Sequence, residues 1–143
     1  MDKSAQVTLA RTMVPRKVFS LSAAQRALPL VRRVIQDVVT EYAAMIETQE
    51  LLEGVQRHGC VSRIQSLQQR LTQCSQRLRE YARELDDVGV ELRDYARGAV
   101  DFPCSYRGRR LVLTWQLGQE AIENWYDPIG QACMPLTALR QMH

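Results

Sequence analysis

The stretch "IQSLQQRLTQCSQRLREYARELDDV", residues 64–88, decides the fold. Its apolar side chains alternate steps of three and four without a miss: Ile64, Leu67, Leu71, Cys74, Leu78, Tyr81, Leu85 and Val88. This spacing, sustained over more than three heptads, is typical of a helix that packs along a coiled-coil seam. We therefore expect one long amphipathic helix here and a second helix that covers its seam.

The second helix precedes this one in the chain. Residues 19–54 open with Ser20 and Ser22, which are favourable N-caps, and Gln25 follows Ser22 at the spacing of a capping box. We expect the helix to begin near Ser22 and to kink or restart at Pro29, which has no amide hydrogen and collides with the preceding turn. Beyond Pro29 a heptad seam follows, with Gln49 as its one polar member: Val31, Ile35, Val38, Tyr42, Met45 and Leu52.

The turn between the helices, "EGVQRHGC" at residues 53–60, holds Gly54 and Gly59. Glycines at these points end one helix and let the chain reverse. A short connection between two seams of similar length predicts an antiparallel hairpin, with helices of roughly 35–50 Å at 1.5 Å per residue.

The first helix also has a second apolar face. Val34, Val39 and Ile46 lie beside the seam, at positions that an isolated two-helix coiled coil fills with charge. Something must cover this face: the C-terminal segment, a second copy of the chain, or a helix of a partner protein. These three residues are therefore our candidates for an interaction surface.

After Gly89 the apolar period falls towards two, which indicates strands. We expect three short antiparallel strands at roughly 90–93, 99–102 and 110–115, with Gly108 in a hairpin turn. The fold class is α+β: a long, coiled-coil-like antiparallel helical hairpin packed with a small C-terminal antiparallel β-sheet. We expect residues 1–18 to form a flexible basic tail and 19–143 a single domain, with the hairpin at about 20–88, the β unit at 89–127 and a C-terminal tail at 128–143.

Four segments together resemble a known bacterial family: "FSLSAAQRALPLVRRVI", "GVELRDYARGAVDFP", "GRRLVLTW" and "GQEAIENWYD". The chain is similar to the family catalogued as domain of unknown function 2203 over about residues 19–136. This resemblance implies the fold and kinship, and no established activity. The family usually reads Leu-Cys-Trp where this chain has Thr114 in the middle, and Trp-His where it has Tyr126. A phenol with an ordinary pKa near 10 is a poor metal ligand and a poor base at pH 7.

Oxygen-bearing side chains gather in the C-terminal half. Asp101, Glu120, Tyr126 and Asp127 are the candidate ligand or metal residues, because carboxylates suit hard cations such as magnesium or calcium. The alternative is that they anchor turns and a helix start. No serine lies in a nucleophile elbow, and the two histidines lie in the helical turn and at the last position. The sequence identifies no catalytic residue and no particular cofactor, and we expect no enzyme.

Charge and composition narrow the functions further. The formal charge of +3 comes from residues 1–18, and the other 15 basic and 15 acidic residues balance. Arg63, Arg70 and Arg77 recur every seven residues beside the second seam, and we interpret them as ion-pair partners of glutamates such as Glu41 rather than a phosphate-binding stripe. Four widely spaced cysteines, no signal segment and no long apolar run favour a cytoplasmic protein with free thiols and no membrane contact.

Three functional hypotheses follow. The first is a non-enzymatic interaction or assembly module that uses its helical hairpin, and it predicts a homo-oligomer or a protein partner. The second is a protein that binds a divalent metal or small ligand at carboxylates of the β unit. The third is association with nucleic acid through the basic N-terminal tail, which a neutral folded body makes the least favoured.

Overall fold

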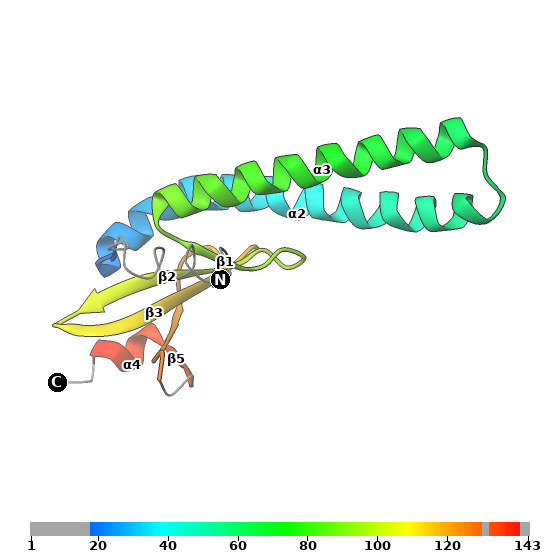
Figure 1. The fold of residues 1–143 in the computed structure, drawn as a ribbon. Coiled ribbons are helices and arrows are strands. Elements are labelled where there is room, and N and C mark those ends of the chain that lie inside the picture. The colour runs from blue at the N-terminus through cyan, green and yellow to red at the C-terminus, as the bar shows by residue number, and fades with distance from the viewer. Residues whose placement is uncertain (1–17, 130–131, 141–143) are drawn as a thin grey trace, which may run out of the picture.

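The computed structural model describes residues 18–129 and 132–140. Helix α2 (Leu21–His58) and helix α3 (Val61–Val88) form a long antiparallel hairpin, and a five-stranded antiparallel sheet packs beside one half of it (Figure 1). The predicted α+β fold is thus confirmed. The predicted basic tail lies outside the described residues except for Val18.

Helix α2 begins at Leu21, close to the predicted start near Ser22, but its cap differs from the predicted capping box. Its N-cap is Ser20, whose Oγ accepts a hydrogen bond from the Ala23 amide at 3.1 Å. The predicted capping box at Ser22 is wrong, because Gln25 instead binds the backbone of Ile122: its Nε2 donates to the carbonyl at 3.1 Å and its Oε1 accepts from the amide at 3.3 Å. The helix runs through Pro29 without a restart.

The seam between the helices follows the predicted pattern on α3 and shifts on α2. On α3, Leu67, Cys74 and Leu78 are buried as expected. On α2, Thr48 is buried at 2% exposure, whereas Gln49 is exposed. Thr48 Oγ1 donates to the Ala44 carbonyl at 2.7 Å, so its hydroxyl is satisfied within its own helix and its methyl group can face the seam.

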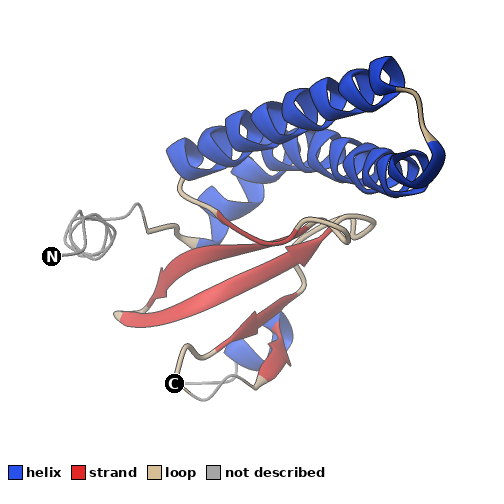
Figure 2. Cartoon of the chain, turned by 45° about the vertical axis from the view of Figure 1, so that its right-hand side comes forward, coloured by secondary structure: helices blue, strands red, loops and turns tan. Residues whose placement is uncertain are grey.

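The sheet has five strands in the order of the chain, β1-β2-β3-β4-β5. They are β1 (Glu91–Asp94), β2 (Ala99–Tyr106), β3 (Arg109–Gln116), β4 (Asn124–Tyr126) and β5 (Cys133–Pro135). The first three are those that the sequence predicted, while β4, β5 and the short helix α4 (Leu136–Arg140) were missed. The last strand and α4 lie in the segment that we expected to be a tail, and β5 pairs with β4. Figure 2 shows β4 and β5 at the edge of the sheet farthest from the hairpin.

One face of the sheet packs against the half of α2 that precedes residue 40. The core contains Phe102, Trp115 and Trp125 from the strands together with Ile35 and Val38 of the helix, each fully buried. Val34 belongs to the same core, at 5% exposure, and Val39 packs against it. The chain's own C-terminal segment therefore covers the first part of the second apolar face, and Val34 is not a surface residue.

A backbone bridge ties the start of α2 to the sheet. The Phe19 amide donates to the Pro103 carbonyl at 2.8 Å, and the Ser105 amide donates to the Phe19 carbonyl at 3.0 Å. The Phe19 and Phe102 rings meet edge to face, with centroids 5.4 Å apart. These contacts fix where α2 enters the molecule. No helix in the described part of the chain is long and apolar enough to cross a membrane.

The turn between β1 and β2 allows a sharp prediction. Gly98 has φ +71°, and a Cβ there would lie 2.7 Å from Ile35 Cγ2 and 2.9 Å from Val39 Cγ2. A left-handed backbone costs a non-glycine residue about 1–2 kcal/mol, and the forced displacement of core side chains adds about as much again. We expect Gly98→Ala to lower the free energy of unfolding by about 3 kcal/mol, measured by urea denaturation.

Gly108→Ala is the matched control. Gly108 has φ +79°, but a Cβ there would meet nothing within 4 Å, so only the backbone cost of about 1 kcal/mol remains. Equal losses in the two variants would show that the close approach of the turn to α2 has no energetic weight.

Candidate functional site

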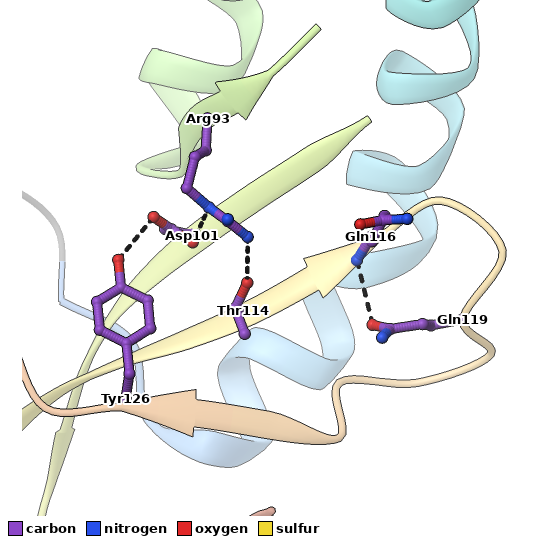
Figure 3. A network of polar contacts seen from close by, with 6 residues as sticks. All are labelled: Arg93, Asp101, Thr114, Gln116, Gln119 and Tyr126. Atoms are coloured by element: carbon purple, nitrogen blue, oxygen red, sulfur yellow. Dashed lines mark hydrogen bonds and ion pairs between the residues drawn. The ribbon is translucent and has the colours of Figure 1, made fainter. Parts of the chain in front are cut away.

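A polar network lies on the face of the sheet opposite the core. Asp101 stands between the buried residues Val100 and Phe102 on β2, so the alternation of a strand turns its side chain to the other face. Asp101 pairs with Thr114 on β3, and Thr114 pairs with Asn124 on β4, two residues before Tyr126. The register therefore places the side chains of Asp101, Thr114 and Tyr126 on one face, as Figure 3 shows.

Arg93 of β1 completes this network (Figure 3). Its Nε donates to Asp101 Oδ1 at 3.1 Å and its Nη2 donates to Thr114 Oγ1 at 2.7 Å, while the Tyr126 hydroxyl donates to Asp101 Oδ2 at 2.8 Å. The register of β1 shifts between Leu92 and Asp94, at Arg93, and a shift of this kind re-aims a side chain. The four side chains link four adjacent strands.

The charges and hydrogen bonds of this network indicate that it ties the strands together rather than forming a reactive centre. We call Arg93, Asp101, Thr114 and Tyr126 the clamp. Asp101 is only 6% exposed, and both of its oxygens have donors, one of them a cation. Burial, the hydrogen bond to Asp101 and the charge of Asp101 raise the pKa of Tyr126 to about 12, although Arg93 opposes the shift. The phenol therefore stays protonated near neutral pH, where it donates a hydrogen bond and cannot act as a base.

The structure does not bring the other two candidates into this network. The Glu120 side chain is exposed in the loop between β3 and β4, and the backbone carbonyl of Glu120 accepts a hydrogen bond from Arg32 of α2. Asp127 pairs with Arg109 at 2.7 Å, and its Oδ1 accepts from the Ile129 amide at 2.8 Å. Among the residues that the structure describes, no three His, Cys, Asp or Glu side chains are grouped so as to hold a metal ion.

Sequence reasoning found Asp101 and Tyr126 but missed Arg93 and Thr114. One signal was present: Thr114 and Tyr126 are two positions at which this chain departs from the usual pattern of the family it resembles, and both belong to the network. Arg93 gave no signal, because nothing in its own segment reports the register in which β1 pairs with β2.

A second candidate surface lies where the hairpin leaves the sheet. A groove of about 650 Å³ has an apolar floor that includes Tyr42 and Met45 of α2 and Leu78 of α3, and it has Arg79 among its charged lining residues. Tyr95, from the turn after β1, also lines it, and the Tyr42 and Tyr95 rings lie 5.8 Å apart. A smaller groove of about 470 Å³ is also lined by Tyr42, together with Val39, Ala43 and Ile46. Both grooves border the turn between β1 and β2, through Tyr95 in the larger groove and Ala96 in the smaller one.

Asp101→Asn tests the clamp. The amide oxygen can still accept from Arg93 and the amide nitrogen can donate to the Tyr126 hydroxyl, so the substitution removes the negative charge that both groups bind, and a hydrogen bond to a charged group contributes about 2 kcal/mol. We expect this loss in the free energy of unfolding, measured by urea denaturation.

Asp127→Asn is the matched control for that variant. It removes a more exposed ion pair worth about 0.5 kcal/mol and keeps an oxygen for the Ile129 amide. A loss for Asp101→Asn no larger than that of this control would contradict the clamp.

The raised pKa of Tyr126 predicts a pH dependence. In the unfolded chain the phenol ionises near pH 10, whereas in the folded chain it ionises near 12. Its stabilising contribution is therefore complete below pH 10 and is lost as the pH rises to 12. We expect the wild type to lose stability more steeply than Tyr126→Phe over this range, by urea denaturation at each pH. Parallel curves would contradict the shift.

The comparisons with known proteins identify the family of the chain. No curated protein and no solved structure matches the chain. One family model matches, over residues 17–129, and its description reads "uncharacterized conserved protein (DUF2203)". The match covers the hairpin, the first four strands and the whole polar network. The chain therefore belongs to the DUF2203 family.

Proposed function

We propose that the protein is a non-enzymatic interaction module of the cytoplasm that binds another protein through its distal hairpin, residues 43–75. One observation carries this proposal: beyond the β1–β2 turn the two helices continue past the sheet and, within residues 18–129 and 132–140, have only each other as neighbours (Figure 1). A helical hairpin held out from the body in this way offers its side chains to a partner, as in helix-docking recognition.

Apolar side chains on the distal hairpin support the proposal. Ile46 is 36% exposed and Leu51 is 41% exposed, and Val61 at the start of α3 is 69% exposed. Ile46 continues the second apolar face of α2 past the point at which the sheet ends its cover. The two grooves beside Tyr42 extend this apolar surface to the base of the hairpin. Exposed apolar side chains beside apolar grooves are typical of protein-binding surfaces.

The other hypotheses have less support. A metal or small-ligand site at the carboxylates is disfavoured because their oxygens already have partners. Asp101 accepts hydrogen bonds from Arg93 and Tyr126, and Asp127 forms an ion pair with Arg109. The nucleic-acid hypothesis rests on the basic tail of residues 1–18, of which only Val18 lies in the described part of the chain. The four cysteines are free thiols, which suits a reducing compartment.

Site-specific photo-crosslinking in cells tests the proposal. A photoreactive phenylalanine derivative replaces Leu51 on the distal hairpin in one strain of the full chain, and the exposed Arg110 on β3 in a control strain. We expect discrete covalent protein adducts from position 51 and none from position 110 after irradiation, seen by immunoblotting. An absence of adducts at 51, or equal adducts at both positions, would contradict the hairpin as the binding surface.

A further inference from the structure

The larger groove at the base of the hairpin has an apolar floor that is open to another segment. Tyr42, Met45 and Leu78 of the two helices line it together with Tyr95 of the β1–β2 turn, which lies beneath the hairpin (Figure 1). Tyr95 is 36% exposed, although its ring lies 5.8 Å from that of Tyr42. Aromatic surface with this exposure in a groove is typical of a docking site.

The end of this groove nearest the sheet is acidic. Asp86 and Asp87 line it there, and both lie in the last turn of α3, which contains no basic residue. The last turn is the negative end of the helix dipole, so carboxylates at this place are unfavourable unless a cation lies close by. A basic segment at this end of the groove would therefore be attracted both by the carboxylates and by the helix end.

The chain carries a segment of this kind just before the first described residue. Residues 8–17 read "TLARTMVPRK" and contain three basic residues and no acidic one. They also contain the apolar residues Leu9, Met13 and Val14. Basic and apolar residues in one short segment complement a groove with an apolar floor and an acidic end.

The point at which this segment joins the fold also suits the groove. Phe19 forms a parallel bridge with Cys104 of β2, so Val18 precedes it on the side of the β1–β2 turn. Tyr42 lies about 35 Å from Phe19 along α2, at roughly 1.5 Å per residue. An extended chain advances about 3.3 Å per residue, so roughly 11 residues before Phe19 cover that distance. Residues 8–18 supply this length.

We infer that residues 8–17 of the same chain lie in the larger groove. The basic pair Arg16 and Lys17 then lies at the acidic end, and Leu9 lies near Tyr42. The inference goes beyond the proposed function, because it concerns a contact within one chain and holds whether or not a partner binds the distal hairpin. A partner that uses the larger groove has to displace this segment.

Photo-crosslinking within the purified full chain tests the inference. A photoreactive phenylalanine derivative replaces Arg83, which is exposed and lines the larger groove. After irradiation and proteolysis, we expect mass spectrometry to find links from position 83 to residues 8–17. Gln73 is the matched control, because it is exposed on the same helix but lines a different surface, and it should give no such link. Ala43, which is exposed in the smaller groove, should give none either.

A mixture of isotopically labelled and unlabelled protein identifies the copy that supplies the segment. A link within one chain joins two peptides with the same isotope content, whereas a link between two copies also joins labelled to unlabelled peptides. We expect only links within one chain.

A change of charge at the acidic end tests how the segment is held. Asp86→Lys should lower the yield of the links from position 83 by about threefold or more at physiological salt, because it replaces an attraction to Arg16 and Lys17 by a repulsion. Glu84→Lys is the matched control. It makes the same charge change two residues away, and residues two apart on a helix do not face the same way. It should leave the yield unchanged.

The outcomes decide the inference without reference to the proposed function. Links from position 83 to residues 8–17 of the same copy would support it. Absence of these links, equal links from position 73, links from position 43 instead, or links between copies would overturn it. A yield that Asp86→Lys leaves unchanged, or that Glu84→Lys lowers equally, would overturn the placement of the basic pair. The proposed function is decided separately, by the adducts at position 51 in cells.

Discussion

The structure depends on one helix that must bury two faces at once. Helix α2 packs against α3 along one side and against the sheet along another, and Val31, Ile35 and Val38 have no exposed surface as a result. A small antiparallel sheet needs a cover on one face to be stable, and α2 supplies it. Hydrogen bonds between residues far apart in the sequence hold α2 and the sheet together. Gln25 and Arg32 of α2 both bind the backbone of the β3–β4 loop.

The sequence predicted what periodicity can report and missed what depends on distant contacts. The α3 seam and strands β1 to β3 follow from spacing alone, because each has enough residues to show its period. Strands β4 and β5 have three residues each, too few for a period to emerge. The α2 seam was misplaced by one position because a threonine that satisfies its own hydroxyl behaves as an apolar residue, as Thr48 does. Gln25 does not form the predicted capping box, because its side chain hydrogen-bonds to the backbone of Ile122, 97 residues away.

The candidate site was only half predictable for a related reason. Asp101 and Tyr126 were both candidates in the sequence, but their contact across β3 depends on β4, which was not predicted, and the role of the group depends on Arg93. A carboxylate pair without a cation nearby would suggest a metal site or an acid and base, whereas a carboxylate between an arginine and a phenol is a satisfied structural anchor. The pairing of β1 with β2, which brings Arg93 to Asp101, decides between these two interpretations, and no local pattern in the sequence reports its register.

The two ends of the molecule therefore have different physical roles. Near the sheet, a packed core covers α2, and hydrogen bonds from Gln25 and Arg32 hold the helix to the β3–β4 loop. That part of the chain therefore buries its own apolar surface. The distal hairpin has only a narrow seam, in which Thr48, Leu52, Leu67 and Cys74 are the buried residues, and segments with few buried apolar contacts open most readily. A partner on the distal hairpin would add contacts where the chain has fewest, so binding and local stability would rise together.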